Sequence, residues 1–300
     1  MGTVLVTGAS GLLGRRVVPL LRTDGWEVVT SGRRDRDHPV DVTHPGALTA
    51  LVESVGPDVI VHLAGGVATG DISTWDLNLL PGVELLLASV RSPRPFRLVL
   101  IGSAAEYGTA GDQVTEETPT NPVSDYGRAK NILTTTAKRF HEAGVEVLVL
   151  RPFNIVAPEL PPTNALGNLR AQVMDSRAAD PYIVRCGRLD VIRDFVTADF
   201  VAEVVARCLD AWPKTPVVNV ASGQGIVLRD LFDAFGTELG VRLEYRPDPE
   251  LVAIPAPDLM TADPTALESA TGLRCRVDPH RLALELIGPD GSMAVSSGAT

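Results

Sequence analysis

Short apolar runs alternate with longer amphipathic segments over most of the chain. The apolar runs predict β-strands at 3–7, 26–30, 58–64, 96–102, 145–150 and 217–220. Between them, apolar positions recur at helical spacing over 12–22, 46–55, 82–91, 124–142 and 199–211. Because strands that are apolar throughout are covered by helices on both faces, the pattern predicts an α/β fold with a doubly wound parallel sheet.

The texture of the sequence changes after Arg151. Residues 151–167 are rich in Pro and Asn, which predicts a loop. In sheets of this kind ligands bind outside the carboxyl ends of the strands, so we expect this loop to lie over those ends.

The same change in composition and in the hydrophobic pattern predicts two regions and a C-terminal tail. We expect residues 1–155 to form a dinucleotide-binding domain, to which 191–222 return. Residues 156–190 and 223–288 are expected to form a smaller C-terminal substrate lobe. The last segment, 289–300, is polar and rich in Gly and Ser, which predicts disorder.

The composition narrows the class of protein. The 300 residues are 45% apolar and 21% charged, which is typical of a globular chain. No apolar run reaches about 18 residues and no basic-then-apolar leader is present, so we expect a cytoplasmic protein without a membrane span. Three widely spaced cysteines (Cys186, Cys208 and Cys275) fit a reduced compartment, and the five histidines show no metal-ligand spacing. A net charge of −10 disfavours nucleic acid and anionic membranes as partners.

A glycine-rich turn follows the first predicted strand. Gly8, Gly11 and Gly14 have the spacing Gly-x-x-Gly-x-x-Gly and lead into the helix at 12–22. In such a turn the first glycine permits a tight bend, the second lets the backbone approach a pyrophosphate, and the third lets the helix lie close to the strand. The helix then directs its N-terminal amides at the phosphates. The sequence therefore predicts a dinucleotide site that includes Ser10 and Leu12.

The end of the second predicted strand bears on the choice of cofactor. An acidic residue there would bind the 2′-hydroxyl of NAD, whereas arginine accommodates the 2′-phosphate of NADP. This strand ends with Ser31, Arg33 and Arg34 and has no acid before Asp35. The residues favour NADP(H), with NAD(H) as the alternative, although a solvated loop of mixed charge has the same composition. Asp41 is a candidate for binding the adenine amino group, or else a helix cap.

Tyr126 and Lys130 lie four residues apart, so they share one face of the helix predicted at 124–142. A free phenol titrates near about 10, and we expect the Lys130 ammonium to lower the pKa of Tyr126 toward neutrality. Ser103 lies upstream and offers a hydroxyl that can hydrogen-bond a substrate oxygen. The three residues could exchange a proton with a carbonyl or alcohol oxygen, although Tyr-x-x-x-Lys also occurs by chance on many helices.

Taken together, these motifs resemble the extended short-chain dehydrogenase/reductases, the NAD-dependent epimerase/dehydratase family, and within it the NDP-4-keto-6-deoxyhexose reductases. The motifs are Thr7-Gly8-x-x-Gly11-x-x-Gly14, Asp41-Val42, His62-Leu63-Ala64-Gly65, Ser103 with Glu106-Tyr107-Gly108, Tyr126-x-x-x-Lys130 and Arg151-Pro152-Phe153-Asn154. The later segments 187–196 and 219–223 resemble its nucleotide-sugar branch.

The resemblance implies a Rossmann-type fold with Ser103, Tyr126 and Lys130 as catalytic residues, Lys130 also binding the nicotinamide ribose. It adds further cofactor contacts at Val42, Leu63, Ala64, Gly65, Pro152 and Asn154. It also implies a substrate site formed by Ser103, Ala104, Asn154 and Arg193. Within that site, Asn154 and Arg193 are expected to contact the substrate diphosphate. An arginine fork suits phosphate oxygens, although a salt bridge to a local Asp would equally explain Arg193.

The chain departs from the family pattern in three places. Sugar dehydratases of this family carry Asp-Glu where this chain has Ala104-Ala105, which disfavours dehydration. Asn78 is one residue out of register with the usual Asn-x-x-Gly, so a fourth catalytic residue is in question. Residues 253–263 contain no arginine where nucleotide-sugar enzymes often hold a second phosphate clamp.

The sequence predicts an NADPH-dependent ketoreductase acting on a bulky biosynthetic ketone. The substrate is either an NDP-4-keto-6-deoxyhexose or a polyketide or other natural-product ketone, and the absent second arginine favours the latter. The alternatives are an NDP-sugar epimerase with tightly bound NAD and a non-catalytic cofactor-sensing or scaffold protein. The apolar stretch 79–90 and the Tyr126 helix could form a homodimer interface, or could simply cover the sheet.

Overall fold

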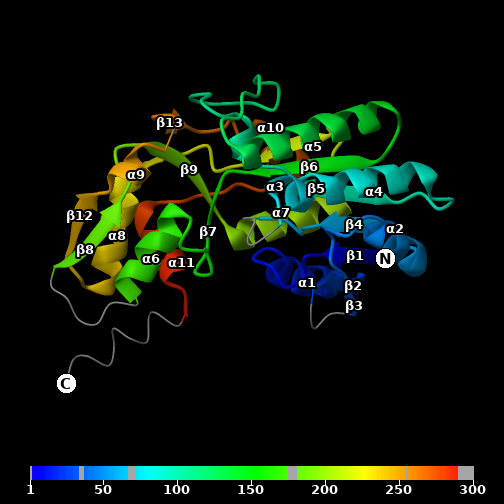
Figure 1. Ribbon diagram of the computed structural model, residues 1–300, viewed down its shortest axis with the longest axis horizontal. Helices are drawn as coiled ribbons and strands as arrows, with labels where there is room; N and C mark the ends of the chain where they lie inside the picture. Colours follow the sequence, from blue (N-terminus) through cyan, green and yellow to red (C-terminus); the bar gives the residue numbers. More distant parts are fainter. Residues whose placement is uncertain (1, 34–36, 67–71, 175–180, 255, 290–300) are drawn as a thin grey trace.

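A seven-stranded parallel sheet forms the centre of the larger part of the molecule (Figure 1). The computed structural model describes residues 2–33, 37–66, 72–174, 181–254 and 256–289. The strand order is β10-β6-β5-β4-β1-β2-β3, and every neighbouring pair is parallel. The strands are β1 (Thr3–Thr7), β2 (Glu27–Gly32), β3 (His38–Pro39), β4 (Val59–His62), β5 (Arg97–Ile101), β6 (Val147–Pro152) and β10 (Val217–Val220). This topology confirms the predicted doubly wound α/β fold.

Helices cover both faces of this sheet, as the amphipathic pattern requires. On one face, α1 (Gly14–Thr23) and α7 (Ala198–Asp210) bury an apolar stripe against the strands. On the other face lie α2 (Ala47–Val55), α4 (Leu80–Arg91) and α5 (Asp125–Glu142). Strands β4 and β6 are buried along their whole length, because helices exclude water from both of their faces.

A second apolar core lies beside the sheet, on the left in Figure 1. It gathers side chains from α6 (Ala165–Met174), β8 (Tyr182–Cys186), α8 (Leu228–Leu239) and α11 (Pro279–Ile287). Strand β12 (Leu243–Pro247) pairs with β8, and β9 (Ile192–Thr197) pairs with β7 (Asn154–Val156), β11 (Gly225–Val227) and β13 (Leu259–Met260). The remaining elements are α3 (Thr74–Asn78), the 3-10 turn η1 (Ala104–Glu106), α9 (Pro249–Val252) and α10 (Thr265–Thr271). The domain boundaries given above stay a prediction.

The expected loop at 151–167 is wrong at both of its ends. Arg151 and Pro152 still belong to β6, and Asn154–Val156 forms β7, which pairs in parallel with Phe195–Thr197 of β9. At the other end, Ala165 already begins α6. Strand pairing between segments distant in sequence overrides the local loop propensity of Pro and Asn.

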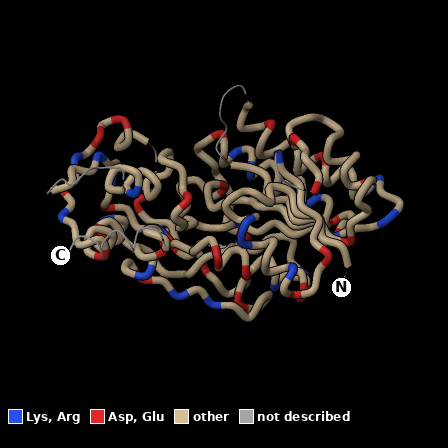
Figure 2. Tube along the Cα trace, turned by 90° about the horizontal axis from the view of Figure 1, so that it is seen from below, with Lys and Arg blue, Asp and Glu red and all other residues tan. Residues whose placement is uncertain are grey.

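Charged residues of both signs are interspersed along the chain in Figure 2. Among the described residues, no helix is long and apolar enough to cross a membrane. The predictions for Arg34 and for nearly all of the 289–300 tail fall outside the described residues.

Candidate active site

The glycine turn has the shape that a dinucleotide site requires. Gly8 has a φ of +68°, and a Cβ there would lie 2.5 Å from the Ala64 nitrogen. At Gly14 a Cβ would lie 2.3 Å from the Gly8 oxygen, so only glycine lets α1 begin this close to β1. The backbone therefore leaves open, over the turn, the space that a pyrophosphate would occupy.

A cavity of about 220 Å³ lies over this turn. The predicted cofactor residues that line it are Gly8, Ser10, Gly11, Arg33, Asp41, Val42, Leu63, Ala64 and Gly65. Sequence reasoning missed Gly32, Val40, Thr43, Ile72 and Leu77, which also line it. Gly32 and the apolar positions carry no signal that separates them from turn and core residues.

Several predicted cofactor residues do not line this cavity. Ser31 is fully buried, and its hydroxyl has no hydrogen-bond partner among the described residues. Leu12, Gly14 and Pro152 lie beneath the turn or within β6 rather than at the cavity wall. Asp41 does not cap α2: its carboxylate accepts hydrogen bonds from the Thr43 nitrogen (3.0 Å) and hydroxyl (2.7 Å), which lowers its pKa.

The Ser103 turn is fixed by the buried carboxylate of Glu106. Glu106 Oε1 accepts hydrogen bonds from the Ser103 nitrogen (2.9 Å) and from the Thr134 hydroxyl of α5 (3.0 Å). Its Oε2 accepts a hydrogen bond from Arg151 Nε (2.8 Å) and forms an ion pair with Arg151 Nη2 (2.8 Å). Gly102 makes room for this carboxylate, since a Cβ there would lie 2.5 Å from Glu106 Oε1. One carboxylate thus ties β5, α5 and β6 together around Ser103.

The structure brings Ser103, Tyr126 and Lys130 together. The Ser103 side chain lies close enough to Tyr126 to lower its pKa, and the Lys130 amine lies 5.7 Å from the centroid of the Tyr126 ring. Lys130 Nζ donates a hydrogen bond to the Ile101 carbonyl oxygen (2.9 Å), at the end of β5. The i,i+4 spacing on α5 produces this geometry, because residues one turn apart share a face.

The expected direction of the Tyr126 pKa is wrong. Burial raises the pKa of Tyr126, the Ser103 hydrogen bond opposes that rise, and the Glu106 charge adds to it. Burial also lowers the pKa of Lys130 to about 8, against the opposing charge of Glu106. At neutral pH Tyr126 is therefore a protonated phenol, which suits a proton donor.

His62, which opens the motif at the end of β4, is a buried neutral residue. Its Nδ1 lies 2.7 Å from the Thr7 hydroxyl, and burial together with the Lys130 charge lowers the pKa of His62 to about 3. It therefore carries no charge at neutral pH and holds β4 to β1.

Asn78 reaches the site in spite of its shifted register. A break at Leu79, between α3 and α4, absorbs the additional residue. The Asn78 side chain accepts a hydrogen bond from the Gly66 nitrogen (3.0 Å) and donates one to the Gly66 oxygen (2.9 Å). A Cβ on Gly65 would lie 3.1 Å from Asn78 Oδ1 and 3.4 Å from Lys130 Nζ. Because Gly65 also lines the cofactor cavity, that cavity adjoins Lys130.

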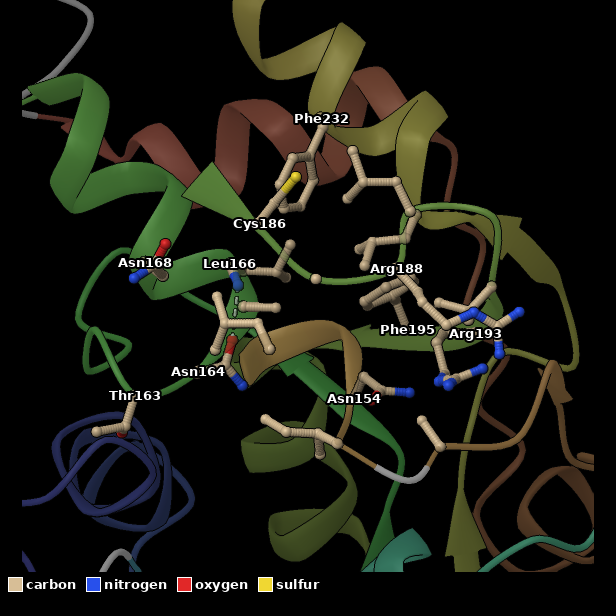
Figure 3. Close-up of a pocket in the computed structure, with 18 of the residues that line it drawn as sticks. Asn154, Thr163, Asn164, Leu166, Asn168, Cys186, Arg188, Arg193, Phe195 and Phe232 are labelled. Carbon is tan, nitrogen blue, oxygen red and sulfur yellow. Dashed lines mark hydrogen bonds between the residues drawn. The ribbon is translucent and has the colours of Figure 1, made fainter. Parts of the chain in front are cut away.

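A second cavity, of about 260 Å³, lies between β7, β9 and the second apolar core (Figure 3). Asn154 and Arg193, two of the predicted substrate residues, line it, while Ala104 is buried in a separate apolar cluster. Burial and the nearby Arg188 charge lower the pKa of Arg193, and the charge of Asp258 partly opposes them. The Arg193 guanidinium makes one hydrogen bond among the described residues, to the carbonyl oxygen of Ile192 (2.7 Å). No carboxylate of those residues is in direct contact with it.

Sequence reasoning missed most of this second cavity. Its further lining includes Asn164, Asn168, Arg188, Phe195 and Phe232. The apolar members read as ordinary core positions in the sequence. Asn164 carries one signal in the sequence, because Asn is a preferred residue at the start of a helix. In the structure its side chain accepts a hydrogen bond from the Leu166 nitrogen (2.9 Å) at the start of α6.

Comparison with known proteins supplies a family and several relatives. The sequence model of the NAD dependent epimerase/dehydratase family matches residues 4–221. The chain is 31% identical over 269 residues to the dTDP-6-deoxy-L-talose 4-dehydrogenase (NAD(P)(+)) of Kitasatospora kifunensis, covering 85% of this chain and 83% of that protein. It is 26% identical over 258 residues to the GDP-6-deoxy-D-mannose reductase of Pseudomonas aeruginosa, covering 82% and 83%. The structure of RMD from Pseudomonas aeruginosa complexed with NADPH has a TM-score of 0.81 at 24% identity and covers 98% of each chain.

Proposed function

The chain belongs to the NAD dependent epimerase/dehydratase family, and from this premise we propose that it is an NADPH-dependent ketoreductase of nucleoside-diphosphate 4-keto-6-deoxyhexoses. The family and the relatives identify an NAD(P)-dependent enzyme that acts on sugar hydroxyl or keto groups. The finer proposal rests on one observation: Arg193, half-buried and without a carboxylate partner among the described residues, faces a cavity beside Asn154. A half-buried unpaired guanidinium is an anion site, and a diphosphate supplies that anion.

The residues present fit a nicotinamide dinucleotide. The glycine turn leaves room for the pyrophosphate, Arg33 lies at the cavity wall, and Gly65 connects the cavity to Lys130. Bound NADPH would supply a hydride to the ketone carbon. Ser103 would donate a hydrogen bond to the carbonyl oxygen, and Tyr126 would transfer its phenolic proton to the same oxygen. The Lys130 ammonium, 5.7 Å from the centroid of the Tyr126 ring, would stabilise the negative charge that develops on the phenol as its proton leaves.

Reduction fits this site better than dehydration. Ala104 and Ala105 follow Ser103 in η1 and provide neither an acid nor a base. Retained NAD, as in an epimerase, is disfavoured by Arg33 at the wall of the cofactor cavity, where an acid would instead bind the ribose hydroxyls. A non-catalytic protein would not need Ser103 and Tyr126 side by side with Lys130 next to them.

A second candidate substrate is a polyketide ketone, which the apolar part of the second cavity favours. Leu189, Val191, Phe195 and Phe232 line that cavity. NADPH consumption distinguishes the two substrate classes when dTDP- and GDP-4-keto-6-deoxyhexoses are compared with an aromatic polyketide ketone. We expect consumption with a nucleotide sugar. NADPH consumption with the polyketide ketone but with neither nucleotide sugar would instead identify polyketide ketones as the substrate class.

Cofactor preference gives a further prediction. Arg33→Asp should weaken NADPH binding by about tenfold or more, because it removes a charge-assisted contact to the 2′-phosphate and adds repulsion. NADH binding should be unchanged or stronger, since NADH lacks that phosphate and the new carboxylate can accept hydrogen bonds from its ribose hydroxyls. Titration of nicotinamide fluorescence measures both affinities. The exposed variant Arg139→Ala serves as the control. Equal losses for the two cofactors would contradict the assignment of Arg33.

We further propose a cytoplasmic homodimer. Leu80, Leu87 and Val90 of α4 are between 40% and 63% exposed, and Ile132 of α5 is 45% exposed. Helices α4 and α5 contact each other, so these side chains offer an apolar surface to a second copy of the chain. Light scattering of the purified protein that gave a monomer mass would refute the dimer.

A further inference from the structure

The connection between β8 and β9 carries an arginine that sequence reasoning did not assign. Arg188 lines the same cavity as Arg193 and Asn154, and Figure 3 shows the two guanidinium groups at one end of it. The Arg188 charge contributes to lowering the pKa of Arg193, which also indicates that the two cations lie close together. Two neighbouring cations at a cavity wall repel each other unless an anion lies nearby.

Two exposed carboxylates supply that anion in the structure described here. Arg188 Nη2 lies 2.8 Å from Asp190 Oδ2, and Nη1 lies 2.7 Å from Asp258 Oδ1. The arginine side chain is 35% exposed, whereas Asp190 and Asp258 are 69% and 83% exposed. Asp258 directly precedes β13, which pairs with β9 at Ile192 and Arg193, so the strand register brings its carboxylate to this wall.

These ion pairs are easily exchanged. Ion pairs that are open to water contribute little to stability, because water and salt screen them and the side chains lose conformational freedom. A diphosphate offers oxygens that match the fork of an arginine, and binding within the cavity would remove part of the competing water. Arg188 holds Asp190 through both Nε and Nη2 and Asp258 through Nη1, so a diphosphate must replace these contacts with a comparable fork of oxygens.

We propose that Arg188 is the second phosphate-binding arginine of this cavity, and that Asp258 and Asp190 are stand-in anions that it releases when a substrate diphosphate binds. The inference rests on the proposed function, since it takes a nucleoside diphosphate as the ligand. It also accounts for the lack of arginine in 253–263, because the clamp comes from the β8–β9 connection instead. In this arrangement Asp258 competes with substrate, so its removal strengthens binding.

Calorimetric titration of the full chain with dTDP, UDP and GDP, and with the matching nucleosides, tests this inference. For the tightest nucleoside diphosphate, Arg188→Ala should raise the dissociation constant by about tenfold or more. Asp258→Asn should lower it by about threefold, since it removes the competing charge without shortening the side chain. The nucleoside affinities should not change. Arg274→Ala, which removes an exposed arginine from its pair with Glu268, serves as the matched control.

The opposite signs separate substrate binding from a purely structural role. If Arg188 only joined the β8–β9 connection to Asp258, both variants would weaken binding or leave it unchanged, and either result would overturn the inference. If Arg193→Ala weakens diphosphate binding and Arg188→Ala does not, the proposed function stands and the role of Arg188 fails. If the unaltered protein binds none of the three nucleoside diphosphates, both are wrong.

Discussion

Replacing Tyr126 with Phe is expected to lower the rate of ketone reduction by about 10²- to 10⁴-fold, the range that a positioned general acid contributes. The ring and its contact with Lys130 are retained, and only the hydroxyl beside Ser103 is lost. NADPH affinity should therefore stay within about twofold of that of the unaltered protein. Single-turnover oxidation of NADPH, followed by absorbance, measures the chemical step apart from binding.

The direction of the Tyr126 pKa sharpens this expectation. Because burial raises that pKa, the phenol is protonated throughout the neutral range and the reduction does not wait for proton uptake by Tyr126. A rate for Tyr126→Phe within about threefold of the unaltered protein would remove Tyr126 from the mechanism. The variant Tyr182→Phe, at a partly buried tyrosine of β8 beside the second apolar core, controls for the general effect of losing a phenolic hydroxyl.

Glu106→Gln should produce the largest loss of stability, about 3–5 kcal/mol in the free energy of unfolding. The substitution removes the charge that faces the buried Arg151 guanidinium and disturbs the acceptor of the Ser103 nitrogen and the Thr134 hydroxyl. Urea unfolding followed by circular dichroism measures the change. Glu142→Gln, in the exposed pair with Arg139, should cost at most about 1 kcal/mol.

A double variant separates the two tasks of Glu106. Replacing Glu106 by Leu and Arg151 by Met removes both charges, and a buried ion pair exchanged for apolar side chains often leaves stability unchanged. We expect part of the stability to return but the turnover to stay low, because the Ser103 nitrogen and the Thr134 hydroxyl still lack their acceptor. Recovery of both properties would show that Glu106 does not position Ser103.

Local patterns were sufficient to predict the sheet and the proximity of Tyr126 and Lys130. The helical spacing of Tyr126 and Lys130 is enough to place them on one face of α5. Gly8 and Gly14 lie where the backbone leaves no room for a Cβ, and the spacing of the glycines predicts this. The break at Leu79 shows the limit of this reasoning, because it brings Asn78 close to Gly65 although its register had put its role in question.

The remaining features depend on contacts between distant segments. Asn154–Val156 is a strand only because Phe195–Thr197 lies beside it, and Arg188 meets Asp258 only because β13 pairs with β9. The sign of the Tyr126 pKa depends on burial, which the spacing of Tyr126 and Lys130 does not reveal. Sequence reasoning therefore predicted the residues that the structure brings together beside Tyr126 but missed most of the lining of the second cavity.

The most direct test of the account is the fate of the hydride. NADPH that carries deuterium at the transferred position of the nicotinamide is incubated with the protein and the nucleotide 4-ketosugar that it consumes. The account predicts one deuterium at the former carbonyl carbon of each product molecule and one NADP⁺ formed per product. A product without deuterium, formed while the added NADPH remains unoxidised, would contradict reduction and favour an epimerase with a retained cofactor.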